Sequence, residues 1–545
     1  MANVTIPRTV LAVDAGVATT AIALVGRPDG RWRLLGSLAA PAPAAPEDLA
    51  AVLVGRIAAA DPELAKTVGL TVDAIDDLPR LEARTQRPQT LAVLGASRRA
   101  VGLVEAIAAR TPWRVLPASP DTHDPREMTE LALRAEVSAL LIGASEPPGP
   151  DEGSALDDMA ALVAAVVRRR PELEVVLAGP ISARRTWTDG LGDDADARTA
   201  HVHEAPPLKL RSGPDEPLRE ILERLLPRSS DTRYTAVRTI ITLADVLGRR
   251  IELIEIGFDG GLRAIASPGV ADQGPVAVAV RSAEAGLIDP DPEQGTVDSV
   301  LAWTTGSLDR HRMGDRLRDL RANPWADAAG DGARLRLAAG RAALARLVAL
   351  TPELTAMPSP DLTIAAGGVF SLAPGQAVAL SVADVVRRAG ATQLALDHAR
   401  LLGPLGTIED PDERRPFLAD LADDLLTPLG TVVVVGGIPQ VRRRGSPVGT
   451  LSLDGDGATG EHELLAGDLA FLDLPPGDRA LATLTFRDVV RIGRRTRRVS
   501  VPVSGGLAGV LVDLRDVPLR LPDRRDRRRA ALAAWGELAW PGEST

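Results

Sequence analysis

The segment LAVDAGVATTAIALV, residues 11–25, decides the fold because it predicts two buried strands joined by a short polar turn. Asp14 ends the first strand, Gly16 lies in the turn, and Thr19 and Thr20 begin the second strand. Backbone N–H groups and threonine hydroxyls of such a turn bind phosphate oxygens, and the glycine permits close approach. Asp14 is also the candidate ligand for Mg²⁺, held through the ion's water molecules. An ordinary β-hairpin without a ligand is the alternative.

A second hairpin of the same kind is predicted in ELIEIGFDGGLRAIA, residues 252–266. Glu255 and Gly257 take the places that Asp14 and Gly16 have in the first hairpin. The candidate phosphate-facing residues of this turn are Asp259, Gly260 and Gly261. An Asp-Gly hairpin turn without a ligand is again the alternative.

A third glycine-rich turn follows the buried strand predicted in LTIAAGGVF, residues 362–370. Gly367 and Gly368 are the candidates here, because paired glycines let the backbone lie flat against an adenine or a ribose. Each motif alone is weak. The order of the three, two acid hairpins followed by a strand with two glycines, is much more specific for a nucleotide site.

The composition excludes several classes of protein. The chain has no cysteine, so disulfides, thiolate catalysis and cysteine zinc sites are absent. The only lysines, Lys66 and Lys209, lie in no P-loop or protein-kinase motif. A net charge of −10 disfavours nucleic acid as a partner. No apolar run reaches the roughly 18 residues of a membrane span, so we expect a cytoplasmic protein with no membrane partner.

Alternating strand and helix patterns predict an α/β protein of several domains. We expect a first lobe with inserted βα units at 1–235, a second lobe at 236–427, and a β-rich domain with a C-terminal amphipathic helix at 428–545. Residues 181–215 are predicted to be an exposed loop, in which the HVHE run at 201–204 is solvated rather than a metal site.

The ordered triplet of turns resembles the two-lobed ATPase domain shared by actin, Hsp70 chaperones and sugar kinases. Within that group the chain looks most like the glutamate mutase accessory protein family called MutL or GlmL. The further matching segments are LLIGASEPPG at 140–149, SAEAGL at 282–287 and GATQLALDHARLLGPLG at 390–406.

The resemblance implies a nucleotide-binding fold that closes on ATP and Mg²⁺, and a partner among the adenosylcobalamin-dependent mutases. Carried over by motif, the first phosphate motif is Asp14, Gly16, Thr19 and Thr20, the second is Glu255, Gly257 and Gly261, and the adenosine motif is Gly367 and Gly368. The chain departs from the family pattern at Val17, at Glu255 and at the Phe258-Asp259 pair, where the family has Ser, Asp and hydroxyl residues. The residues therefore imply a weak ATPase at most.

Three functions are compatible with these motifs. The leading one is an ATP-responsive accessory or chaperone-like protein, with the added C-terminal domain as the surface for a partner or for a homo-oligomer. The second is a degenerate pseudo-ATPase that serves as a binding scaffold. The third is a small-molecule kinase of the same fold, which needs a general base. No catalytic residue can be assigned from the sequence.

Overall fold

The structure is a computed structural model that describes residues 8–145, 152–191, 201–206, 217–270, 273–287, 294–324, 331–371, 373–439, 444–455, 458–515 and 517–540. Two compact units make up the chain. The first unit consists of Met1–Gln86, Ser229–Ala279 and Gly286–Thr545, and the second consists of Arg87–Arg228 and Val280–Ala285.

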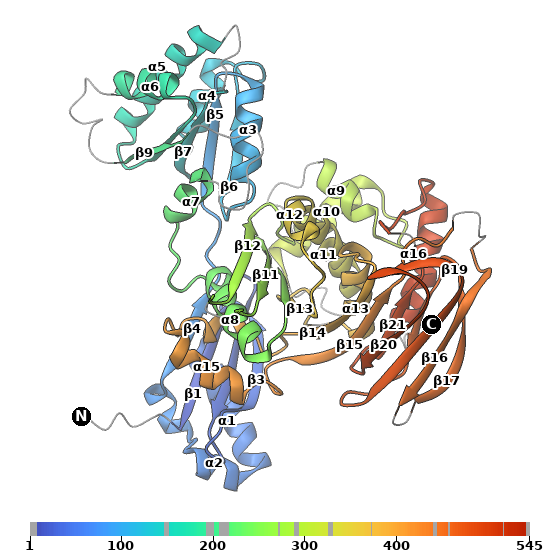
Figure 1. The fold of residues 1–545 in the computed structure, drawn as a ribbon. Coiled ribbons are helices and arrows are strands. Elements are labelled where there is room, and N and C mark those ends of the chain that lie inside the picture. Colours follow the sequence, from blue (N-terminus) through green and yellow to red (C-terminus); the bar gives the residue numbers. More distant parts are fainter. Residues whose placement is uncertain are drawn as a thin grey trace. The chain divides into compact units, whose positions relative to one another are not determined.

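The first unit begins with a four-stranded sheet in the order β3-β2-β1-β4 (Figure 1). Its strands are β1 (Thr9–Ala15), β2 (Thr19–Gly26), β3 (Arg33–Pro41) and β4 (Arg80–Arg84). β1 pairs antiparallel with β2 and parallel with β4. Helices α1 (Pro46–Ala60) and α2 (Pro62–Val68) and the 3₁₀ helix η1 (Val72–Asp77) pack on one face through a shared apolar cluster.

β1 is apolar on both of its faces, which explains why it lies in the middle of this sheet. Leu11 and Val13 face the cluster of α1 and α2, whereas Val10 and Ala12 face a second cluster that includes α8 (Thr232–Leu247). A strand covered on both faces has a continuous apolar run, as residues 10–13 do.

The second sheet of this unit has eight strands in the order β12-β11-β10-β13-β14-β15-β21-β18. Its strands are β10 (Ile251–Ile256), β11 (Gly261–Ser267), β12 (Val276–Ser282), β13 (Leu362–Ala366), β14 (Gly390–Leu396), β15 (Thr427–Val434), β18 (Leu469–Leu472) and β21 (Val510–Asp513). The first four positions repeat the strand order of the first sheet, and β10, like β1, is antiparallel to its hairpin partner β11 and parallel to its other neighbour β13.

The repeated sheet order defines two lobes of similar topology. The described helices between β12 and β14 are α9 (Gln294–Leu301), α10 (Arg310–Ala322), α11 (Asp331–Ala349), α12 (Pro352–Ala356) and α13 (Gly375–Val385). After β14, α14 (Leu402–Leu405) and α15 (Pro411–Asp420) pack on α8, and α14 also contacts β1 and β4 of the first sheet. The predicted fold class, a two-lobed actin/Hsp70/sugar-kinase-like architecture with additional β-structure, is therefore confirmed.

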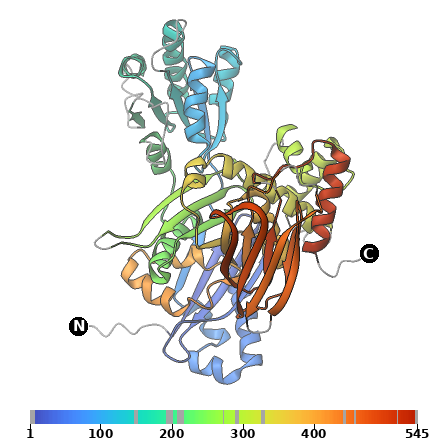
Figure 2. The same cartoon turned by 45° about the vertical axis from the view of Figure 1, so that its right-hand side comes forward.

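The C-terminal β-structure is a second layer on the extended sheet of the second lobe. Strands β16 (Pro447–Gly455), β17 (Ala458–Leu465), β19 (Arg479–Ile492) and β20 (Arg494–Ser504) form an antiparallel sheet in the order β17-β16-β19-β20. It is the orange-to-red sheet of Figure 2. One apolar cluster joins this sheet to β15, β18 and β21. Helix α16 (Arg525–Ala539) buries Leu532 and Trp535 but leaves Leu538 exposed.

The second unit contains a separate five-stranded parallel sheet in the order β6-β5-β7-β8-β9. Its strands are β5 (Thr90–Gly95), β6 (Arg114–Ala118), β7 (Val137–Gly143), β8 (Glu174–Ala178) and β9 (Val202–Ala205). Its helices are α3 (Arg98–Ala108), α4 (Pro125–Ala132), α5 (Glu152–Arg169), α6 (Ile181–Leu191) and α7 (Pro217–Arg224). They pack on the sheet through two apolar clusters.

The prediction of an exposed loop at 181–215 is wrong in part, because α6 and β9 lie within it. Trp187 anchors α6 in the apolar core, and β9 extends the parallel sheet beside β8. Polar residues dominate this stretch, so the apolar pattern was too weak to show either element. Among the described helices, none has the length and apolar character required to cross a bilayer.

Candidate functional site

The first acid hairpin closes with a tight turn between β1 and β2. The Gly16 N–H donates to the Thr19 carbonyl at 2.8 Å. A Cβ atom on Gly16 would lie 2.8 Å from that same oxygen, so the turn requires glycine. Asp14 lies two residues before the glycine, at the end of β1.

The Asp14 carboxylate has partners outside its own hairpin. Thr232, at the start of α8, donates its hydroxyl to Oδ1 at 3.1 Å. Nη1 of Arg400 lies 3.7 Å from Oδ2. Burial raises the pKa of Asp14 above its ordinary value, and the positive charge of Arg400 opposes part of that rise.

The second acid hairpin has the same backbone turn. The Gly257 N–H donates to the Gly260 carbonyl at 2.8 Å, and Glu255 lies two residues before this glycine. Burial, reinforced by the charge of Asp14, raises the pKa of Glu255 to about 8. Glu255 is therefore largely protonated at neutral pH, and a protonated carboxyl group has one O–H donor to offer a ligand.

The third turn follows β13, which lies beside β10 in the second sheet. Gly367 has φ 95°, in the left-handed region that glycine tolerates. A Cβ atom at this position would collide with the carbonyl oxygen of Ile256 at the end of β10. This close approach brings the third turn against the second hairpin.

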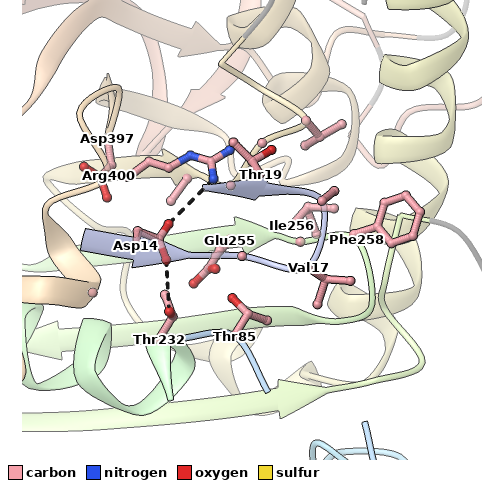
Figure 3. Close-up of a pocket in the computed structure, with 18 of the residues that line it drawn as sticks. Asp14, Val17, Thr19, Thr85, Thr232, Glu255, Ile256, Phe258, Asp397 and Arg400 are labelled. Carbon is pink, nitrogen blue, oxygen red and sulfur yellow. Dashed lines mark hydrogen bonds and ion pairs between the residues drawn. The ribbon is translucent and has the colours of Figure 1, made fainter. Parts of the chain in front are cut away.

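The three turns meet at one cavity of about 70 Å³, shown in Figure 3. Seven of the eleven predicted residues line it: Asp14, Gly16, Thr19, Glu255, Gly257, Gly367 and Gly368. Pockets for small ligands typically measure about 300–1,000 Å³, so the residues here surround a narrow space.

The other four predicted residues, Thr20, Asp259, Gly260 and Gly261, do not line this cavity. Thr20 is buried opposite Ala15 in the hairpin. Asp259 is 9% exposed, and its Oδ1 has no hydrogen-bond partner within the described part of the chain. The segment at Gly286 packs directly on the second turn, where its Cα leaves no room for a side chain.

Several cavity residues were not predicted from the sequence, namely Thr85, Thr232, Arg336, Asp397 and Arg400. Asp397 directly follows the apolar strand β14, and an acid at the end of a predicted strand is the sequence feature that could have identified it. Its carboxylate accepts the backbone N–H groups of Leu401 and Leu402 at 3.0 and 3.3 Å. Burial nevertheless raises the pKa of Asp397 to about 7.

Among the described residues, no three His, Asp or Glu side chains are arranged so that they could hold a metal ion. Asp14, the predicted magnesium ligand, is paired with Arg400 instead. Away from this cavity, in the second unit, the two histidines of the HVHE run, His201 and His203, both contact the Glu174 carboxylate, at 3.1 and 2.8 Å.

Comparison with known proteins gives distant structural likenesses. No family model matches the chain, and no curated protein matches it. One similar solved structure is a nucleotide-free acetone carboxylase, at 12% identity and a TM-score of 0.26, covering 84% of this chain and 81% of that one. Another is the PilM–PilN type IV pilus biogenesis complex, at 12% identity and a TM-score of 0.22, covering 76% and 98%.

A third is a glucokinase from Leishmania braziliensis, at 12% identity and a TM-score of 0.22, covering 73% of this chain and 92% of that one. At such scores the likenesses carry no argument about function. The class of the protein, an actin/Hsp70/sugar-kinase-like fold, follows from its repeated sheet order.

Proposed function

We propose that this chain is a nucleotide-binding protein that takes ATP in the cavity between its two similar sheets. The observation that carries the proposal is the convergence of two acid hairpins and the Gly367-Gly368 turn on that cavity. Backbone N–H groups at glycine turns, the Thr19 hydroxyl and the Arg400 guanidinium are the groups that bind phosphate.

The narrow cavity indicates how the site operates. At about 70 Å³ it is too small for ATP, so binding requires the lobes to separate. A ligand that binds one conformation better shifts the population toward it. We infer an ATP-operated accessory or chaperone-like protein, whose hold on a partner changes as the lobes move.

For the partner, the motif resemblance favours an adenosylcobalamin-dependent mutase of the glutamate mutase type. Co-purification of the full chain with such a mutase, tested with and without ATP, checks this part of the proposal. ATP-dependent release or capture supports it, and equal recovery under both conditions contradicts it.

A magnesium ion at Asp14 would have to displace Arg400 from that carboxylate. The residues present therefore fit a metal poorly.

Phosphoryl transfer is the second candidate function, favoured by one observation. Glu255 and Asp397 line the cavity, and burial brings their pKa values to about 8 and about 7. Groups that titrate near the working pH are suited to general acid–base catalysis. ADP release that depends on a sugar or another small acceptor would identify a kinase, whereas hydrolysis raised only by a protein would identify an accessory ATPase.

Thermal unfolding in the presence of ATP tests nucleotide binding directly. At a nucleotide concentration 100 times the Kd, the free energy of unfolding rises by about 2.7 kcal/mol. Thr19→Val should weaken binding roughly tenfold, because it removes a hydroxyl that faces the cavity.

Thr20→Val is the matched control, since Thr20 is equally buried but does not line the cavity. Absence of any shift with ATP, ADP or AMP would reject nucleotide binding and favour a binding scaffold.

A further inference from the structure

Arg400 lies in an unusual backbone conformation beside the cavity. It follows β14 by a few residues and has φ 53°, the one positive φ recorded for a residue other than glycine in the described part of the chain. Such conformations cost free energy and persist where surrounding structure requires them, often at ligand sites. The loop thus directs this side chain into the cavity at a cost in stability.

The guanidinium group of Arg400 is poorly satisfied by the protein. Its distance of 3.7 Å to Asp14 is too long for a hydrogen bond. The two side chains are only 10% and 12% exposed. This ion pair is the one salt bridge within 4.0 Å that Arg400 makes in the described residues, and its charge also acts on Asp397. No hydrogen bond there uses its five N–H donors, so most of them remain available for an anion.

The same group lies against two of the three glycine turns. A Cβ atom on Gly368 would lie 2.6 Å from Nη2 of Arg400, and one on Gly16 would lie 3.9 Å from Nη1. In Figure 3 the side chain extends from the side of Asp397 across Asp14 toward Thr19. A positive charge therefore stands where the first and third turns meet.

We propose that Arg400 supplies the cation for the nucleotide phosphates, so that this site binds ATP without a divalent metal. The inference rests on the proposed nucleotide binding. In proteins that bind triphosphates, metal ions commonly neutralise the phosphate charge. Here a guanidinium, which suits phosphate oxygens in geometry and charge, occupies the place beside Asp14.

The acids around the cavity fit metal-free binding as well. Burial holds the pKa of Glu255 and of Asp397 near or above neutrality, so the cavity carries less negative charge than its three carboxyl groups suggest. When phosphate binds, Arg400 exchanges its contact with Asp14 for phosphate oxygens. Thr232 then remains as the hydrogen-bond donor to Asp14.

Calorimetric titration of the full chain with ATP, in excess Mg²⁺ and separately in EDTA, tests the proposal. The wild-type affinity should differ by less than about threefold between the two conditions. Arg400→Met should lose roughly tenfold or more in EDTA, the range of one or two charge-assisted hydrogen bonds. Arg400→Lys should recover part of that loss.

Asp14→Asn separates the two roles of the carboxylate. If Arg400 is the phosphate cation, this variant binds metal-free ATP more tightly, because the guanidinium no longer shares its charge with Asp14. If Asp14 holds a metal, the same variant weakens binding in Mg²⁺ only. Arg494→Met, on the exposed end of β20, is the control and should match the wild type in both conditions.

The failures are distinguishable. Wild-type binding that needs Mg²⁺, with Arg400→Met unchanged, overturns the role of Arg400 and leaves nucleotide binding intact. No ATP binding by the wild type in either condition overturns the proposed function itself. The melting temperature of each variant shows whether it is folded. If Arg400→Met does not fold, the comparison of wild-type affinity in Mg²⁺ and in EDTA still decides between the two outcomes.

Discussion

The two acid hairpins share a backbone and differ in chemistry. Each has an acid two residues before a glycine whose N–H closes the turn at 2.8 Å. The first strand of each hairpin also pairs in parallel with a later strand, β1 with β4 and β10 with β13. Asp14 has Thr232 and Arg400 as direct partners, whereas the Glu255 carboxyl makes no hydrogen bond or ion pair within 4.0 Å among the described residues and has only the more distant charge of Arg233 to oppose the effect of burial on its pKa.

The difference between the hairpins shows that the hairpin itself does not decide the charge of its acid. Arg400 opposes the effect of burial on the pKa of Asp14, whereas burial and the charge of Asp14 together raise the pKa of Glu255 to about 8. Residues contributed by other elements therefore decide the charge of each acid. Asp14 of the first hairpin is paired with a cation, whereas Glu255 of the second is largely protonated at neutral pH and has an O–H group to donate.

The largest expected effect comes from disturbing the contact between the third turn and the second hairpin, which the first hairpin does not share. Gly367→Ala should lower the free energy of unfolding by about 2–4 kcal/mol, because it adds backbone strain and a collision with the Ile256 carbonyl. Urea unfolding measures the change. Gly69→Ala is the matched control, since Gly69 also has a positive φ but open space around it, and it should cost about 1 kcal/mol. Equal losses would contradict the predicted contact.

Stability measured at several pH values tests the difference in protonation between Asp14 and Glu255. The pKa of Glu255 is about 8 in the folded chain and near its ordinary value of 4.5 when unfolded. Between those values the folded chain binds the extra proton, so stability falls as the pH rises from 4.5 to about 8. Glu255→Gln should remove its own share of this fall, on the order of 1 kcal/mol or more, while Asp397, whose pKa is raised to about 7, keeps its share.

Urea unfolding at several pH values measures that slope. Glu82→Gln, on the edge of the first sheet, serves as the control and should keep the slope of the wild type. An unchanged slope in Glu255→Gln would show that Glu255 is ionised in the folded chain.

The smallest expected effect comes from removing a partner of Asp14, which leaves the acid of the first hairpin with fewer contacts, as Glu255 has in the second. Thr232→Val removes the hydroxyl that donates to Asp14 at 3.1 Å and should cost about 0.5–1.5 kcal/mol at neutral pH. Thr232→Ser keeps the hydroxyl and should cost less. If valine and serine destabilise equally, packing rather than the hydrogen bond accounts for the effect.

Local patterns were sufficient to predict both hairpins, the third turn and the fold class, because strand and turn chemistry acts over a few neighbouring residues. They were insufficient for α6 and β9, whose apolar residues are sparse. They also placed Asp259 and Thr20 in the site, although neither lines the cavity. In a hairpin, adjacent residues point to opposite faces, and the sequence alone does not say which face is open.

By itself, the sequence determined the alternation of apolar strands and helices, the glycines that tight turns need and the acids at strand ends. Only the tertiary structure decided which of these groups meet. Arg400 and Asp397 reach Asp14 and Glu255 because two sheets far apart in the chain bring their strand ends to one cavity. The charge of a buried acid depends on such neighbours, and no local motif encodes them.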